Sequence, residues 1–173
     1  MSTSLAAEAV GVPFARCVIT PAARARALEA MASGWLTAGP LTAEFETRFA
    51  TWIGTRHAVA VSSCTAAIEL ALRALDLPDG APVFTPTLTF CGAVQAIVHA
   101  GLRPVLLDAD EQTLTVSVQT IERARATEQP AAMVVQHMAG YPVAGAAAAE
   151  AAGLPPGLVI EDAAHGLGAS VGD

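Results

Sequence analysis

From residue 57 onward, short apolar runs alternate with longer helical stretches. The runs are apolar throughout instead of alternating with polar residues, which is typical of parallel strands that helices cover on both faces. The pattern predicts five strands, at 57–61, 82–85, 104–107, 131–135 and 158–160. It predicts helices between them, at 65–75, 90–100, 118–127 and 143–152. This order indicates an α/β fold with a largely parallel sheet.

Two further helices are predicted before the first strand. Thr20 and Pro21 supply a capping hydroxyl and a proline at the first helical position, and this helix ends before Gly34. A second helix is expected to begin at a Thr42 cap and to end at Gly54. Its apolar residues recur at helical spacing, which predicts one buried face. These residues are Phe45, Phe49, Trp52 and Ile53.

Polar side chains follow the predicted strands at their carboxyl ends, where open parallel sheets bind ligands. Residues 62–65 lead from a strand into a helix N-terminus, where backbone N–H groups can hold a phosphate, but a plain helix cap fits them as well. Asp162 follows an apolar strand. A positively charged ligand group, a salt bridge or a helix cap would each satisfy its carboxylate.

Other strand-end residues also have both a functional and a structural interpretation. Phe90 can lie over a planar ligand, although an aromatic residue at a helix start is more often core. His165 can bond a ligand oxygen or act as a cap, and His137 is interpreted as structural. Asp108 and Asp110 are expected to end a strand and to cap a turn.

Composition excludes several classes of function. The 173 residues carry a formal net charge of −7 without a basic run, which argues against nucleic-acid binding. The chain shows neither a signal peptide nor an apolar stretch of membrane-spanning length, so we expect a soluble, cytoplasmic protein. Cys17, Cys64 and Cys91 form no C-x-x-C pair, so no metal site or disulfide framework is predicted. No activating base accompanies Cys64 or Cys91, so no nucleophile is expected.

The basic residues are all arginine, and the chain contains no lysine. The nine arginines are Arg16, Arg24, Arg26, Arg48, Arg56, Arg73, Arg103, Arg123 and Arg125. A hydrophobic share of 53% with only 14% charged residues indicates that some apolar surface meets a partner.

Four motifs together resemble, in order and spacing, the DegT/DnrJ/StrS-type nucleotide-sugar aminotransferases. They are SGWLTAGP at 33–40, HAVAVSSCTAA at 57–67, PTLTF at 86–90 and VIEDAAH at 159–165. The resemblance covers residues 20–173 and leaves 1–19 as an N-terminal extension. It implies the N-terminal part of a fold-type I large domain that binds pyridoxal 5′-phosphate (PLP).

The resemblance implies that six residues bind this cofactor. They are Cys64, Thr65, Ala66, Phe90, Asp162 and His165. The backbone of 64–66 would cradle the phosphate, and Phe90 would stack on the pyridine ring. Asp162 would pair with the ring nitrogen, which makes the ring an electron sink. His165 would approach the phenolic oxygen.

The resemblance also implies that the loop with Trp35, Leu36 and Thr37 borders the sugar-nucleotide site. Family members usually have Gly at the position of Cys64. They continue past the region of Asp162 into further strands, the Schiff-base lysine and a small domain, all of which are expected to be absent from this chain. We therefore predict no catalytic residue among the 173.

Three interpretations of function remain open. The chain can be one part of a split enzyme that aminates a keto-sugar nucleotide or related cyclitol, with a complementary C-terminal half supplying the lysine. It can be a non-catalytic interaction subunit that regulates a homologous full-length aminotransferase. It can also be an inactive truncated product. The first two predict an oligomer.

Overall fold

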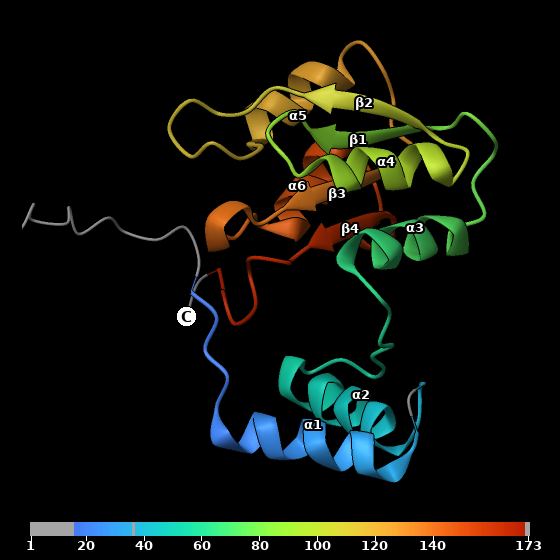
Figure 1. Cartoon of the computed structure of the whole chain (residues 1–173). Helices are drawn as coiled ribbons and strands as arrows, with labels where there is room; N and C mark the ends of the chain where they lie inside the picture. Colours follow the sequence, from blue (N-terminus) through green and yellow to red (C-terminus); the bar gives the residue numbers. More distant parts are fainter. Residues whose placement is uncertain (1–15, 36, 172–173) are drawn as a thin grey trace, which may run out of the picture. The chain divides into compact units, whose positions relative to one another are not determined.

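The computed structural model describes residues 16–35 and 37–171. The chain divides into two compact units, residues 1–60 and 61–173. Each unit is considered by itself below, and Figure 1 shows the elements of both.

The described residues of the first unit form two helices, α1 (Pro21–Ser33) and α2 (Pro40–Ile53). The Thr20 side chain accepts a hydrogen bond from the Ala23 amide, and Gly34 ends α1 in the left-handed conformation, so both predicted ends are confirmed. The predicted Thr42 cap is wrong. The N-cap of α2 is Gly39, three residues earlier, because Pro40 already has the φ that the first helical position requires.

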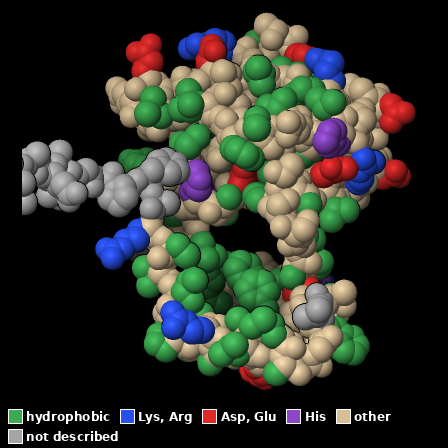
Figure 2. Space-filling model, viewed as in Figure 1, with side chains coloured by type: hydrophobic (Ala, Val, Ile, Leu, Met, Phe, Trp, Pro, Cys, Tyr) green, Lys and Arg blue, Asp and Glu red, His purple; other side chains and the backbone are tan. Residues whose placement is uncertain are grey.

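The predicted buried face of α2 is also wrong. Among the described residues of this helix only Ala50 is buried, whereas Phe45, Trp52 and Ile53 are exposed. Helix α1 has no buried residue either, so it does not cover the apolar positions of α2. The aromatic side chains instead pack along their own helix, with ring centroids 5.6 Å apart for Phe45 and Phe49. Hydrophobic side chains are correspondingly visible on the surface of this unit (Figure 2).

The second unit is built on a parallel four-stranded sheet. Its strands are β1 (Pro82–Pro86), β2 (Arg103–Leu107), β3 (Ala132–Gln136) and β4 (Val159–Asp162). The strand order is β2-β1-β3-β4, and all three pairings are parallel. Every residue of β3 is buried, as expected for a central strand covered on both faces. The predicted parallel sheet is therefore confirmed for four of the five predicted strands.

Helices cover both faces of this sheet (Figure 1). Helices α3 (Cys64–Ala74) and α4 (Cys91–His99) lie on the face that carries Val83 and Val134. Helices α5 (Val118–Arg125) and α6 (Gly145–Ala152) lie on the opposite face, over Phe84 and Met133. Successive residues of β1 and β3 thus enter opposite cores, as the period of a strand requires. Two 3₁₀ turns, Met138–Gly140 and Pro156–Leu158, complete the unit.

The predicted strand at 57–61 does not belong to the sheet. A strand is stabilised by a hydrogen-bonded neighbour, and no strand among the described residues pairs with this segment. The Ala60 amide donates instead to the Glu46 carboxylate, at 2.8 Å. Val59 is 79% exposed, so the apolar pattern that suggested a buried strand belongs to an extended surface segment.

Two structural interpretations are confirmed outside the candidate site. His137 is 6% exposed; its Nδ1 accepts from the Val143 amide at 3.1 Å, and its Nε2 lies 3.0 Å from the Glu161 carboxylate. Asp110 caps the turn after β2, where its Oδ1 accepts from the amides of Gln112 and Thr113. The backbone hydrogen bonds from Thr113 and Gln112 lower the pKa of Asp110 below its ordinary value.

Candidate cofactor site

The carboxyl ends of β1, β3 and β4 and the N-termini of α3 and α4 carry the residues of the candidate site. Parallel register makes Gln136 of β3 the partner of Asp162 of β4. Both side chains are buried at 4% exposure. They share the sheet face of Val134 and Ile160, on which α3 and α4 pack. The sheet therefore places the Asp162 carboxylate and the Gln136 side-chain amide side by side, near the N-termini of α3 and α4.

Asp162 connects β4 to α3. Its Oδ1 accepts a hydrogen bond from the Cys64 thiol, with Sγ 3.2 Å away, and a second from the Ala164 amide at 3.1 Å. No ion pair involves Asp162 within the described part of the chain, so the salt-bridge interpretation of this carboxylate is not supported. A buried carboxylate held by a thiol and one amide retains capacity for a further donor.

The N-terminus of α3 presents backbone N–H groups beside this carboxylate. Ser63 is its N-cap, and the Ser63 hydroxyl accepts from the Ala66 amide at 3.1 Å. Of the three backbone amides at 64–66 that are predicted to bind the cofactor phosphate, the amide of Ala66 is therefore already hydrogen-bonded to the helix cap. The amides of Cys64 and Thr65 lie in the first helical turn, where no carbonyl four residues earlier belongs to the helix.

Close approach of α3 and α4 depends on Gly92. A Cβ at this position would lie 2.3 Å from Thr65 Oγ1 and 2.9 Å from Cδ1 of Phe90. Only a glycine therefore lets the Thr65 hydroxyl and the Phe90 ring occupy their positions at the two helix N-termini. Sequence reasoning missed this residue, because nothing in a single sequence marks a glycine inside a helix as a contact point.

Phe90 is not a core residue. It is 66% exposed at the N-cap of α4, so the core interpretation of this aromatic side chain is wrong. Its backbone amide donates to Gln136 Oε1 at 3.2 Å, which ties the start of α4 to the end of β3. Gln136 directly follows the strand predicted at 131–135, and its role in placing Phe90 becomes visible only in the structure.

His165 is exposed and is oriented by the backbone of the turn after β3. Its Nδ1 accepts from the Ala139 amide at 3.3 Å, which places the proton of the neutral ring on Nε2. Ala139 has a positive φ of 52°, a conformation that is unusual for a residue with a Cβ. The ring can therefore donate from Nε2 to an acceptor such as a ligand oxygen.

The predicted substrate loop belongs to the first unit. The Trp35 indole packs against Gly39, where a Cβ would come within 2.3 Å of the ring, and its N–H donates to the Ala38 carbonyl at 2.8 Å. Trp35 and Thr37 line a hollow of about 460 Å³ beside the start of α2. Leu36 lies outside the described residues. The role of this loop in substrate binding stays a prediction.

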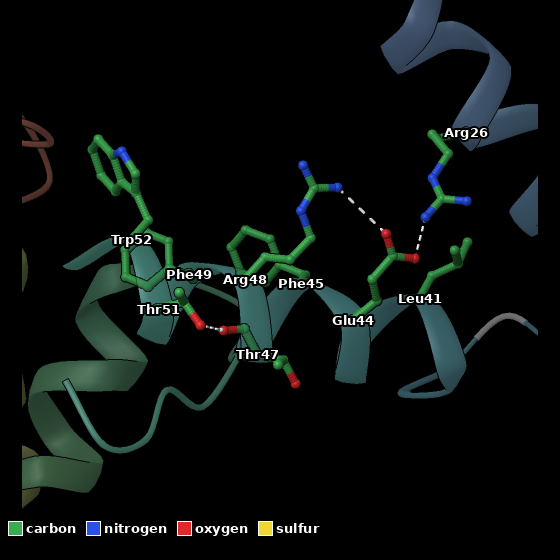
Figure 3. A pocket seen from close by; sticks show the side chains of 9 residues that line it. All are labelled: Arg26, Leu41, Glu44, Phe45, Thr47, Arg48, Phe49, Thr51 and Trp52. Atoms are coloured by element: carbon green, nitrogen blue, oxygen red, sulfur yellow. Dashed lines mark hydrogen bonds and ion pairs between the residues drawn. The ribbon is translucent and has the colours of Figure 1, made fainter. Parts of the chain in front are cut away.

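A second hollow of the first unit, of about 770 Å³, contains none of the predicted site residues. It runs along α2 between aromatic side chains and the charged group of Arg26, Glu44 and Arg48 (Figure 3). Glu44 pairs with both arginines, and these pairs lower the pKa of its carboxyl. Arg26 also pairs with Glu29, so both arginines beside the hollow already have a carboxylate partner.

The described residues contain neither a candidate metal site nor a candidate membrane-spanning helix. No group of three or more His, Cys, Asp or Glu side chains there could hold a metal ion. Likewise, none of the helices in these ranges has the length and apolar character that crossing a bilayer requires.

Comparisons with known proteins agree with this architecture. The chain is 42% identical over 142 residues to the spore coat polysaccharide biosynthesis protein SpsC of Bacillus subtilis, which covers 80% of this chain and 36% of that protein. The sugar aminotransferase CalS13 from Micromonospora echinospora superposes with a TM-score of 0.77 at 32% identity, over 91% of this chain and 44% of that one. Spr1654 from Streptococcus pneumoniae, solved in its PLP form, gives 0.73 at 29% identity, over 81% of this chain and 36% of that one.

The chain therefore spans less than half the length of these relatives. Its fold is part of the large domain of PLP-dependent aminotransferases. A family model matches nearly all of the described chain, over residues 18–173. This chain belongs to the DegT/DnrJ/EryC1/StrS aminotransferase family.

Proposed function

We propose that this chain is the N-terminal portion of a PLP-dependent aminotransferase that transfers an amino group to a keto-sugar nucleotide or a related cyclitol. The observation that carries the proposal is the buried Asp162 carboxylate, 4% exposed, at a strand end beside two helix N-termini. The name of CalS13 as a sugar aminotransferase and that of SpsC as a polysaccharide biosynthesis protein support a sugar substrate.

The residues present fit the chemical groups of PLP. Asp162 can accept from a protonated ring nitrogen and hold the proton there. The exposed Phe90 ring can cover one face of the pyridine, the amides of Cys64 and Thr65 can bind phosphate oxygens, and His165 can donate from Nε2 to the phenolic oxygen. When bound, PLP supplies an electron sink for the carbon that carries the amine.

A second polypeptide segment completes the active site in this proposal. The 173 residues contain no lysine, so the lysine that family members bond to the cofactor has to come from outside them. A complementary C-terminal half is the proposed source, with a homologous aminotransferase subunit as the alternative. The complex is then an oligomer, and we propose that it acts in the cytoplasm on a small-molecule substrate rather than on nucleic acid.

The absorption spectrum of the purified chain with PLP tests this function. The chain alone is expected to leave the cofactor spectrum without the red-shifted band that a lysine adduct gives. Addition of a C-terminal half encoded beside the chain is expected to produce that band, and an amino donor is expected to bleach it. Asp162→Ala is expected to abolish the band because the ring nitrogen loses its partner.

Asp108→Ala is the matched control, because Asp108 is an exposed carboxylate at the end of β2, the edge strand on the opposite side of the sheet from β4. It is expected to leave the band unchanged. If no candidate half produces the band while the chain binds a full-length homologue, the protein is an interaction subunit instead. If it does neither, it is an inactive product.

A further inference from the structure

The hydrogen bonds of Asp162 are distributed unevenly over its two oxygens. The Cys64 thiol, 3.2 Å away, and the Ala164 amide, 3.1 Å away, both donate to Oδ1. Within the described residues, no hydrogen bond reaches Oδ2. The residue as a whole is 4% exposed, so most of the carboxylate is held away from solvent.

The Cys64 thiol stays protonated and therefore remains a hydrogen-bond donor to Asp162. Partial burial, the hydrogen bond to Asp162 and the charge of that carboxylate together raise the pKa of Cys64 to about 11. At neutral pH the sulfur therefore keeps its proton, since losing it would leave two negative groups in contact. The same conditions make Cys64 a poor nucleophile, in agreement with the sequence.

Cys64 and Asp162 come from different elements, and each limits the movement of the other. Cys64 is the first residue of α3, and Asp162 is the last residue of β4. A glycine at position 64 would leave the Ala164 amide as the remaining donor to Oδ1, and the carboxylate could then exchange its oxygens more freely. The thiol therefore adds a second anchor at the point where the helix meets the strand.

We infer that Cys64 is a positioning residue that assigns the two oxygens of Asp162 different tasks: Oδ1 is held by the protein, and Oδ2 receives the N–H of a protonated heteroaromatic ring. The inference rests on the proposed function for the identity of that ring. It concerns the orientation of Asp162 and assigns Cys64 no contact with the reacting atoms.

Alkylation of Cys64 tests the contact without any ligand. In a Cys17→Ser, Cys91→Ser background, the rate of iodoacetamide reaction is measured against pH for the chain and for Asp162→Asn. Removing the negative charge is expected to lower the pKa of the thiol. Each pKa unit lost raises the rate near pH 8 by roughly threefold, because the thiolate fraction grows faster than its nucleophilicity falls. An unchanged rate would overturn the contact.

Binding of pyridoxamine 5′-phosphate tests the orientation, because this probe has a ring nitrogen but needs no lysine. Its dissociation constant and the ¹⁵N shift of its ring nitrogen are measured with Cys64→Ser and Cys64→Ala, after thermal unfolding has shown that both variants fold. Serine keeps a donor and is expected to preserve both values. Alanine is expected to weaken binding about fivefold and to move the ¹⁵N shift towards that of the free probe.

Equal behaviour of the serine and alanine variants would overturn the positioning role, because a side chain that only fills space has no use for a donor. Failure of the probe to bind either the unmodified chain or its complex with the C-terminal half would count against the proposed function and remove the ring from this inference. The alkylation result would still decide whether Cys64 and Asp162 interact, so the two failures are distinguishable.

Discussion

Single side chains in the second unit differ in whether the fold satisfies their polar atoms. Asp162, Gln136 and His137 are almost completely buried, and each makes hydrogen bonds that connect a strand end to a neighbouring loop or helix. Thr85, on β1 with 0% exposure, is different: its Oγ1 has no hydrogen-bond partner among the described residues. A buried hydroxyl without a partner costs free energy that an apolar group of similar shape would not.

Thr85→Val is therefore expected to raise the free energy of unfolding by about 1 kcal/mol, measured by urea denaturation. The matched control is Thr120→Val, since the buried Thr120 hydroxyl accepts from the Ser117 amide at 2.9 Å in the capping box of α5. That variant is expected to lower the stability by about 1 kcal/mol. Destabilisation by Thr85→Val would contradict the assignment of an unsatisfied hydroxyl.

At the scale of the elements, the junction of α3 and α4 depends on the missing side chain of Gly92. Gly92→Ala would force its Cβ against Thr65 Oγ1 and the Phe90 ring. We expect a loss of about 1 to 3 kcal/mol in the free energy of unfolding, as for other overpacked contacts. We also expect pyridoxamine 5′-phosphate to bind several-fold more weakly, because both displaced groups belong to the proposed cofactor site.

The control for this substitution is Gly157→Ala. A Cβ at Gly157 would meet no heavy atom within 4 Å, so its effect on stability is expected to stay within about 0.5 kcal/mol. If Gly92→Ala binds the probe as tightly as the unmodified chain does, then the positions of Thr65 and Phe90 are not important for binding.

The helices and strands also show how much of the fold can be predicted from the sequence. The four strands of the sheet and the six α-helices that the described residues form agree with the prediction within a few residues, because helix caps and uniformly apolar strands depend on local sequence. Residues 57–61 carry the same apolar pattern, but a strand also needs a neighbour, which local pattern does not supply. The apolar positions of α2 were assigned to a buried face for the same reason: periodicity identifies a face, not what covers it.

The candidate site, too, is only partly predictable from the sequence: its residues can be identified there, but their contacts cannot. The resemblance selected Asp162, Phe90 and His165, and the structure provides their surroundings. The contact of Cys64 with Asp162 joins residues 98 positions apart, and the bond from Phe90 to Gln136 spans 46 positions. Such contacts arise from the strand order of the sheet, which spacing along a single sequence does not determine.

At the scale of the whole molecule, the connection between α2 and α3 is extended and exposed, whereas most arginines lie in regular elements. Because lysine is absent and Arg103 precedes Pro104, where trypsin does not cut, trypsin has eight sites in this chain. We expect early cleavage after Arg56, in an exposed bend, and slower cleavage at Arg73 in α3 or at Arg123 in α5. Mass spectrometry of the early products checks the order.

Arg56→Gln is the control for this digestion, and it is expected to remove the early fragment that begins at His57. Early appearance of a cut at Arg73 or Arg123 would contradict the prediction, because it would mean that α3 or α5 opens more readily than the connection.

The parallel sheet has a consequence for how the chain reaches its native state. No two of its strands can pair through a hairpin: residue 82 pairs with 103, 133 with 159, and the central pairing joins 83 to 132. Chain closure over such separations costs entropy before any contact repays it. We expect the central pairing of β1 with β3 to limit the folding rate, so a nascent chain would have to wait for β3 to leave the ribosome before β1 could be enclosed.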